Sequence, residues 1–451
     1  MTTAEPVTTG PAAAEPVTTE PVTAGSDTAV FDELESAVRT YCRRFPAVFT
    51  RASGHRMWDA GGREYIDFLS GAGALNYGHN PADLRAALIA YLQADGPVHG
   101  LDLHTGAKAA FLRRFREVVL APRGLDHRVQ FTGPTGTNAV EAAFKTARRV
   151  TGRTDVIAFT GGFHGLSLGA LAASATSFKR GAAGVPLGHV TRMPYEGYAG
   201  EGVDTIDYLT RMLDDPGSGI DLPAAFVVET VQGEGGLAAA SPVWLRRLAE
   251  VARERGILLI VDDIQAGCGR TGTFFSFEEA GIVPDLICLS KSISGFGMPM
   301  ALVLVRPELD QLGPGEHSGT FRGNNLAFVT ATACLDRWAD PEFTAQVRRN
   351  AAALEDRLTE LAGSFAELGC AVLGRGLIRG LGFTDPELAD RVSRTAFTRG
   401  LLVETSGARG QVLKIMPPIV ADADELAPGL ALLADSIAAA ARQHVSEGDL
   451  S

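Results

Sequence analysis

Two oppositely charged residues each follow an apolar stretch of this chain. Asp262 directly follows the run 257–261, and Lys291 directly follows the run 286–290. The two residues are 29 positions apart. If both runs are buried strands of one open α/β sheet, both side chains reach its carboxyl edge, where such sheets bind ligands. Because a lone buried carboxylate or ammonium is costly, each charge needs a chemical partner at that edge.

Pyridoxal phosphate is a cofactor that needs both charges. A lysine holds it through a Schiff base, and an acid keeps its ring nitrogen protonated. The sequence therefore predicts pyridoxal phosphate, with Lys291 and Asp262 as the catalytic residues. Alternation along the strand places Ile264 on the same side as Asp262, against the ring, and Gln265 follows within reach of the ring's phenolic oxygen. Paired aspartates such as Asp262 and Asp263 also bind hard cations, but no third ligand accompanies them, so we expect no metal site.

A glycine-rich segment, residues 132–138, lies between an expected strand and an expected helix. Free backbone N–H groups and the helix dipole favour a phosphate at such a place. Gly136 permits close approach of the backbone, and Thr137 adds a hydroxyl group. The same segment also fits a capping box, Asn138 with Glu141, that merely starts the helix, and the segment alone does not decide between the two.

Two further loops contain residue types that suit a ligand. Phe163 lies between glycines in the loop 162–165, where an aromatic ring can stack on a planar ligand, although a phenylalanine there is more often a core residue. The loop 317–325 is polar and glycine-rich and precedes a long expected helix. It suits either an anion or a contact between subunits.

Alternating apolar runs and amphipathic helices supply the elements that position these residues. Such alternation predicts an α/β fold with a parallel-rich sheet covered on both faces. The expected strands are 129–131, 156–159, 225–228, 258–261, 286–289 and 301–305, and the expected helices are about 138–149, 325–339, 340–368 and 385–399. Phe31, Leu34, Val38 and Tyr41 recur at helical spacing until Pro46, which predicts a further helix near the start.

The same patterns divide the chain into four parts. Residues 1–29 repeat the string EPVTT, contain no aromatic residue and are expected to be a disordered acidic tail. Residues 30–96 are expected to be the N-terminal segment of a small domain. Residues 97–330 would form the large cofactor-binding domain, and residues 331–445 the C-terminal part of the small α+β domain.

Composition argues against several classes of partner. A net charge of −12 and an isoelectric point near 5.3, without a basic stripe, disfavour nucleic acid and anionic membrane surfaces. The five cysteines are widely spaced and form no Cys-x-x-Cys pair, which indicates a reducing, cytoplasmic setting. No apolar run approaches the roughly 20 residues of a membrane helix, and the first basic residue is Arg39, which does not fit a secretory or transit signal.

Five strings taken together resemble the class III pyridoxal-phosphate aminotransferases. They are GPTGTN at 133–138, GFHG at 162–165, ETVQGEGG at 229–236, VDDIQ at 261–265 and SK at 290–291, and the likeness covers about residues 31–440. Residues 131–141, 289–294 and 319–325 are similar to the diaminobutyrate-forming branch of this class, which serves ectoine biosynthesis. The resemblance implies fold type I of the pyridoxal-phosphate enzymes, in which the large domain carries a mostly parallel seven-stranded sheet beside a smaller α+β domain.

The resemblance also implies an activity and an assembly. The enzyme would move an amino group from L-glutamate to the aldehyde of L-aspartate 4-semialdehyde, giving L-2,4-diaminobutyrate and 2-oxoglutarate. Its partners would be these small amino acid, keto acid and aldehyde substrates, with no nucleic acid and no membrane. Thr320 would reach the phosphate of a neighbouring subunit, so a homodimer or higher homo-oligomer with shared active sites is implied.

Site residues follow from the same resemblance. Lys291 would form the Schiff base, Asp262 would hold the pyridinium proton, and Phe163 would stack on the ring. Gln265 would contact the ring oxygen. The implied cofactor-binding residues are Thr135, Gly136, Thr137, Phe163, His164, Glu229, Asp262, Ile264, Gln265, Lys291 and Thr320, and the implied substrate-binding residues are Glu234 and Lys414.

The substrate end departs from the pattern of the class. Many members clamp the glutamate α-carboxylate with an arginine just before a Pro-Pro pair and pair it with the glutamate that matches Glu234. Here that position is Lys414. A lysine lacks the bidentate fork of arginine, so carboxylate recognition is also open to Arg375 or Arg322.

Several alternative functions stay open at this point. A related ω-aminotransferase of siderophore or antibiotic biosynthesis would carry nearly the same motifs. Decarboxylases, aminomutases and racemases share the fold type, but residues 229–236 and Gln265 favour transamination. A non-catalytic pyridoxal-phosphate sensor fused to a DNA-binding module is a remoter alternative, because Lys291 and Asp262 are retained and the tail offers no recognition helix.

Overall fold

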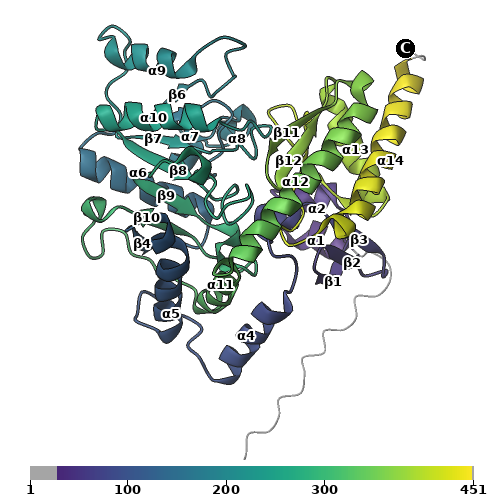
Figure 1. Cartoon of the computed structure of the whole chain (residues 1–451), viewed down its shortest axis with the longest axis horizontal. Helices are drawn as coiled ribbons and strands as arrows, with labels where there is room; N and C mark the ends of the chain where they lie inside the picture. The colour runs from purple at the N-terminus through teal and green to yellow at the C-terminus, as the bar shows by residue number, and fades with distance from the viewer. Residues whose placement is uncertain (1–27, 449–451) are drawn as a thin grey trace, which may run out of the picture.

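The computed structural model describes residues 28–448, which fold into two lobes of different architecture (Figure 1). The predicted tail, residues 1–29, lies outside the described residues except for its last two positions. Within residues 28–448 no helix is both long enough and apolar enough to cross a membrane.

A seven-stranded sheet forms the larger lobe, in the order β4-β10-β9-β8-β7-β5-β6. Its strands are β4 (Arg128–Phe131), β5 (Val156–Phe159), β6 (Val190–Met193), β7 (Ala225–Val228), β8 (Leu258–Asp262), β9 (Leu286–Leu289) and β10 (Leu302–Val305). β10 runs antiparallel to both of its neighbours, and the other pairings are parallel. The prediction of a mostly parallel seven-stranded sheet is confirmed.

Burial on both faces explains why these strands are continuous apolar runs. In β7 all four side chains are buried, and they alternate between the two core clusters that flank the sheet. Helix α6 (Gly136–Thr151) contributes to one cluster, whereas α10 (Pro242–Glu254) and α11 (Asn325–Trp338) contribute to the other. The sheet is thus held between helical layers that fix where each strand ends.

Shorter helices complete the larger lobe. They are α5 (Gly106–Phe115), η1 (Arg116–Leu120), η2 (Ala121–Arg123), α7 (Leu168–Ala173), α8 (Ser177–Gly181), α9 (Thr205–Asp214), η3 (Glu278–Ala280), η4 (Lys291–Ser294) and η5 (Pro307–Leu309).

Two four-stranded sheets form the smaller lobe, in the orders β1-β2-β3-β13 and β11-β12-β15-β14. The first contains β1 (Phe49–Ser53), β2 (Arg56–Asp59), β3 (Glu64–Asp67) and β13 (Leu401–Leu402); the second contains β11 (Ala371–Arg375), β12 (Ile378–Gly382), β14 (Glu404–Ser406) and β15 (Val412–Ile415). β13 pairs in parallel with β3, so an early and a late segment of the chain share one sheet. The predicted domain limits, between 96 and 97 and between 330 and 331, stay predictions.

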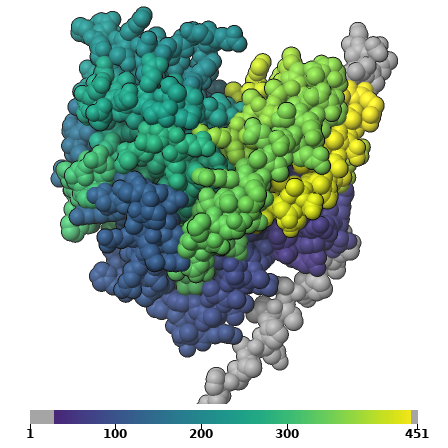
Figure 2. All heavy atoms as spheres, in the orientation of Figure 1, coloured from purple at the N-terminus to yellow at the C-terminus, as the bar shows by residue number. Residues whose placement is uncertain are grey.

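Helices surround these two sheets. They are α1 (Ala29–Leu34), α2 (Tyr41–Arg44), α3 (Ser70–Gly73), α12 (Pro341–Ser364), η6 (Ala366–Leu368), α13 (Pro386–Thr398) and α14 (Ala423–Gly448), whereas α4 (Ala82–Gln93) packs against α11 of the larger lobe. In the space-filling view the green segment that contains α12 lies along the boundary between the lobes (Figure 2).

Two features differ from the sequence-based expectation. The single helix predicted up to Pro46 is wrong: α1 ends at Leu34, and α2 starts only at Tyr41. The apolar residues of that pattern, such as Leu34 at 76% exposure and Val38 at 85%, find no core within this chain that would select one long helix. The edge strand β6 was not predicted, because only half of its short sequence is apolar.

Candidate active site

Asp262 and Lys291 lie at the same edge of the large sheet. β8 and β9 are parallel neighbours, and Asp262 pairs in register with Cys288, so the two strands end side by side. Asp262 is the last residue of β8, and Lys291 begins the helical turn η4 that follows β9. Two residues far apart in sequence therefore reach one edge, where parallel sheets bind ligands.

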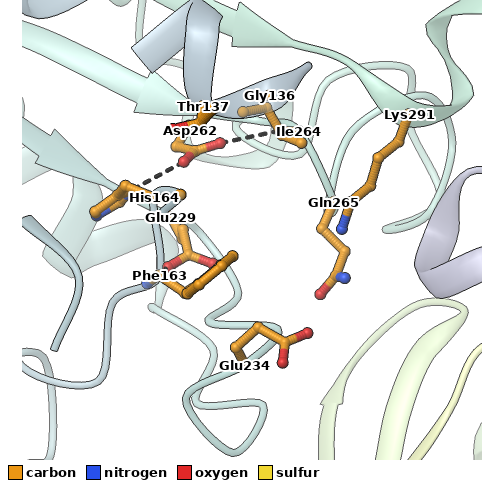
Figure 3. Close-up of a pocket in the computed structure, with 11 residues that line it drawn as sticks. Gly136, Thr137, Phe163, His164, Glu229, Glu234, Asp262, Ile264, Gln265 and Lys291 are labelled. Carbon is orange, nitrogen blue, oxygen red and sulfur yellow. Dashed lines mark hydrogen bonds and ion pairs between the residues drawn. The ribbon is translucent and has the colours of Figure 1, made fainter. Parts of the chain in front are cut away.

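A cavity of about 170 Å³ lies at this edge. Figure 3 shows how the side chains converge on it from several loops. Its lining residues are Gly136, Thr137, Phe163, His164, Gly165, Glu229, Glu234, Asp262, Ile264, Gln265 and Lys291. All of these except Gly165 were singled out from the sequence.

Lys291 is held in an unusual backbone conformation beside the cavity. Its φ of 51° lies in the left-handed region that non-glycine residues rarely adopt, and such strain gathers at functional sites. Burial lowers the pKa of its amine to about 8, against the opposing effect of Glu234 and with a contribution from Lys414. No hydrogen bond or ion pair of Lys291 Nζ occurs within the described residues, so the amine is available to a ligand.

Asp262 is paired with a buried histidine. Its Oδ2 lies 2.8 Å from His164 Nδ1, and its Oδ1 accepts a hydrogen bond from the Ile264 backbone N–H at 3.2 Å. Burial lowers the pKa of His164, but the hydrogen bond and the charge of Asp262 outweigh it, so the net shift is upward. His164 Nδ1 is therefore placed to donate a hydrogen bond to this carboxylate.

The neighbouring Asp263 points away from the cavity, as strand alternation requires. Its carboxylate accepts hydrogen bonds from the Ser276 hydroxyl and backbone N–H. Burial raises the pKa of Asp263 to about 7, although these hydrogen bonds oppose the shift. Asp263 therefore supports the loop behind the site, and no cluster suited to a metal ion occurs in the part of the chain that the structure describes.

Phe163 and Ile264 line the cavity from separate loops. Glu229 holds the backbone of Phe163 in place. The backbone N–H of Phe163 donates to Glu229 Oε1 at 2.7 Å. Glu229 is buried, and burial raises its pKa even though the positive charge of His164 opposes the shift. A flat slot between an aromatic and a branched side chain suits a planar ring.

The start of α6 forms the other end of the cavity. Gly136 and Thr137 occupy its first turn, where backbone N–H groups are free of intrahelical partners. A Cβ at Gly136 would lie 3.1 Å from the Ile264 side chain, and one at Gly165 would lie 2.3 Å from Thr137 Oγ1. Both glycines are therefore required for this close packing, and the helix start suits an anion.

Behind Thr137, a small network fixes its hydroxyl group. Thr137 Oγ1 lies 2.5 Å from Ser167 Oγ, and Ser167 in turn donates to Glu141 Oε1 at 2.7 Å. Glu141 also accepts from the backbone N–H groups of Gly169 and Ala170. Glu141 therefore caps α7 rather than closing the capping box with Asn138 that the sequence left open.

Lys414 lies behind Glu234 at the substrate end of the site. Its Nζ is fully buried and lies 2.6 Å from Glu234 Oε1 and 2.9 Å from Glu404 Oε1. Burial lowers the pKa of Lys414, but Glu404 and Glu234 outweigh it, so the net shift is upward and the lysine is a permanent cation. Sequence reasoning had found Glu234 and Lys414 but not Glu404.

Four other residues considered from the sequence lie outside the cavity lining. Thr135 precedes α6 and donates to the side-chain oxygen of Asn138, and Thr320 lies in an exposed turn. Arg375 donates to the Ser276 carbonyl, and Arg322 to the Phe131 carbonyl. Neither arginine is thus placed to bind a carboxylate in the cavity of this chain.

The donor set fits pyridoxal phosphate. Lys291 offers an unpaired amine, Asp262 an ionised carboxylate, and the start of α6 an anion-binding end. Gln265 donates through Nε2 to the Ala72 carbonyl at 3.0 Å, while its buried Oε1 has no hydrogen-bond partner. A cofactor that brings an aldehyde, a basic ring nitrogen and a phosphate matches these groups in kind.

Comparison with known proteins agrees with this chemistry. The model of the family described as aminotransferase class III matches residues 38–437. The chain is 53% identical over 414 residues to a diaminobutyrate–2-oxoglutarate transaminase of Halalkalibacterium halodurans, covering 92% of this chain and 97% of that protein. Proteins of the same name from Bordetella parapertussis and Streptomyces coelicolor are 56% and 52% identical, covering 91% of this chain and 95% and 98% of their own lengths.

Solved structures share the fold. An ornithine aminotransferase of Toxoplasma gondii, with pyridoxal phosphate at partial occupancy in its active site, superposes with a TM-score of 0.81. It is 28% identical and covers 94% of this chain and 96% of its own. A transaminase from the marine bacterium Virgibacillus has the same TM-score at 18% identity, with coverage of 92% and 99%.

Proposed function

This chain belongs to the class III aminotransferases, and from that premise we propose that it is a diaminobutyrate–2-oxoglutarate transaminase. It moves the amino group of L-glutamate to the 4-aldehyde of L-aspartate 4-semialdehyde and so produces L-2,4-diaminobutyrate and 2-oxoglutarate. The convergence of Lys291 and Asp262 on one cavity carries the aminotransferase chemistry. The identity of 50–56% to relatives of that name over most of the chain supports the choice of substrates.

Pyridoxal phosphate, when bound, supplies an aldehyde that exchanges the amino group and a conjugated ring that accepts the electron pair left by a departing proton. Lys291 provides the amine that holds it. With a pKa lowered to about 8, a useful fraction of Lys291 is neutral near neutral pH, so its Nζ can accept a proton from the substrate's reacting carbon and return it.

Asp262 keeps a proton on the ring nitrogen of the cofactor. The carboxylate is 4% exposed and lies 2.8 Å from His164 Nδ1. In a site shielded from water, a carboxylate next to the ring nitrogen favours the protonated form of that nitrogen. We assign His164 the role of orienting Asp262 rather than touching the cofactor.

Phe163 and Ile264 orient the planar ring and exclude water from its faces. Gly136 and Thr137 would hold the phosphate at the start of α6, and Gln265 would contact the edge of the ring. Glu234 faces the substrate with Lys414 behind it: glutamate brings a carboxylate next to its reacting carbon, whereas diaminobutyrate reacts through an amine with no carboxylate beside it. A cation with a displaceable counter-ion can serve both substrates in turn.

Thr320 lies exposed in the single chain, away from the cavity. We propose that it completes the phosphate site of a neighbouring subunit, so that the working enzyme is a homodimer or a higher homo-oligomer. We further propose a cytoplasmic enzyme that serves ectoine biosynthesis; the five free cysteines are in keeping with a reducing compartment.

The visible spectrum of the protein with pyridoxal phosphate tests the proposal. Addition of 2,4-diaminobutyrate alone should bleach the yellow absorption, and aspartate 4-semialdehyde should restore it. Bleaching by glutamate without any response to 2,4-diaminobutyrate would keep the aminotransferase and discard the proposed substrate. A protein that never turns yellow would overturn the cofactor assignment as well.

A further inference from the structure

Lys414 has two counter-ions, and only one of them faces the cavity. Glu234 lines the cavity, whereas Glu404 is 6% exposed and lies behind it. Glu404 Oε1 lies 2.9 Å from Lys414 Nζ, so the two side chains form an ion pair in the protein interior.

The position of Glu404 is fixed by the sheet. Glu404 on β14 is the register partner of Lys414 on the antiparallel strand β15. Facing residues of such a pair stay within reach of each other wherever the sheet is intact. Glu234, in contrast, is on a loop after β7, and its side chain is 25% exposed. The carboxylate of Glu404 is therefore always held beside Lys414, whereas the carboxylate of Glu234 is the one that contacts the substrate.

Tyr41 confirms where the negative charge is concentrated. Burial raises the pKa of its hydroxyl, and the carboxylates of Glu404 and Glu234 raise it further, while Lys414 opposes them. The residue as a whole is 48% exposed, so its hydroxyl end reaches the carboxylates from the protein surface. Lys414 is not the only cation near these carboxylates, because Lys291 and Lys179 also lower the pKa of Glu234.

We propose that Glu404 is a specificity-determining residue: by adding a second carboxylate to Lys414, it gives the group formed by Glu234, Lys414 and Glu404 a net charge of −1. The trio Glu234, Lys414 and Glu404 then attracts an amino donor of net positive charge and repels one of net negative charge. This inference rests on the proposed function, in which both kinds of donor use one site. At neutral pH 2,4-diaminobutyrate carries a net charge of +1 and glutamate one of −1.

The effect on binding has opposite signs for the two substrates. Neutralising one carboxylate makes the trio neutral, which weakens attraction for the diamino acid and removes repulsion of glutamate. A unit charge several Å away in a medium of effective dielectric constant near 20 changes affinity by ~10-fold or more. Loss of structure, by contrast, would weaken the binding of both substrates.

The test measures each half-reaction separately by the absorbance of the holoenzyme. Glutamate, 2,4-diaminobutyrate and L-ornithine are added singly to the unaltered protein and to the variants Glu404→Gln, Glu404→Asp and Glu367→Gln. Glu404→Asp keeps the charge, and Glu367→Gln removes a carboxylate from an exposed position outside the cavity lining. The apparent dissociation constant for each donor follows from the concentration dependence of the rate.

We expect Glu404→Gln to bind the diamino acids more weakly and glutamate more tightly, so that the ratio of the two constants shifts by ~10-fold or more. The other two variants should stay within ~3-fold of the unaltered ratio. An unchanged ratio, or a parallel loss for all donors, would overturn the proposal. If 2,4-diaminobutyrate itself does not react, the proposed function is wrong. The ratio of the dissociation constants for ornithine and glutamate still tests the role of Glu404.

A second measurement covers the case in which Glu404→Gln does not fold. On the unaltered holoenzyme, 2,4-diaminobutyrate is compared with 4-aminobutyrate, which presents the same reacting amine without the α-ammonium. The proposal expects the diamino acid to bind ~10-fold or more tightly. Equal affinities would show that the charge of the trio is not felt by the substrate.

Discussion

The carboxylate of Asp262 lies 2.8 Å from the ring nitrogen Nδ1 of His164, and both side chains are buried. His164 is therefore placed to donate a hydrogen bond to this carboxylate. An acid that must remain charged inside a protein needs such a partner.

Replacement of Asp262 by Asn should separate binding from turnover. The amide keeps the shape of the side chain and the hydrogen bond with Ile264 N–H but cannot favour a proton on the ring nitrogen. We expect near-normal cofactor content and a rate lowered by ~10²-fold or more. Single-turnover absorbance with glutamate measures the rate, and an unaltered rate would remove Asp262 from the ring nitrogen.

Lys291→Ala tests the assignment of the amine. The variant loses the only described cavity-lining lysine, so we expect loosely held cofactor and loss of turnover in both half-reactions. The comparison is with Lys414→Ala, which lies behind the cavity and should retain the yellow protein. Near-normal transamination by Lys291→Ala would contradict the mechanism.

Glu229 should affect cofactor binding through its contact with the backbone of Phe163. Glu229→Ala leaves the N–H of Phe163 without its acceptor, at a cost of about 1–3 kcal/mol. We expect weaker cofactor binding and a lower melting temperature. Glu229→Gln keeps an oxygen at this place and should bind the cofactor much as the unaltered protein does. Equal effects of the two variants would show that the charge of Glu229, rather than this contact, is what matters.

Much of this site follows from local sequence, because charged residues that end apolar runs must emerge at one sheet edge. Asp262 and Lys291 could be found in that way, as could the helix start at Gly136. Glu404 could not be found in this way, because its contact with Lys414 depends on the register between β14 and β15, which no local sequence pattern predicts.

Two other misses have a different physical origin. Gly165 was noted only as part of the string 162–165 and not as a site residue, because its need for hydrogen in place of a side chain arises only when Thr137 packs against it. The first helix was overpredicted because apolar spacing selects a helix only when a core is available to bury it.

Gly165→Ala should loosen the phosphate end of the cavity. The new Cβ would lie 2.3 Å from Thr137 Oγ1 at a φ of 129°, so Thr137 or the loop must move. Overpacking of this kind costs about 1–3 kcal/mol. Cofactor affinity should fall by ~10-fold, measured by titration of the cofactor-free protein. Gly181→Ala, where no atom lies within 4 Å, is the matched control and should have no effect.

The lowered pKa of Lys291 predicts how the stability of the cofactor-free protein depends on pH. The pKa is about 8 in the folded chain and near its ordinary value of 10.5 in the unfolded chain. Between these values the unfolded chain binds more protons, so stability should rise with pH across this window. The penalty is fully present below pH 8, where it amounts to at most about 3 kcal/mol.

Lys291→Met removes that penalty. Without cofactor, the variant should be more stable than the unaltered protein at pH 7, and the difference should shrink as the pH rises from 8 to 10.5. Urea unfolding at a series of pH values measures it. A stability difference that stays constant with pH would mean that burial does not lower the pKa of the Lys291 amine. Lys291 would then be almost fully protonated near neutral pH.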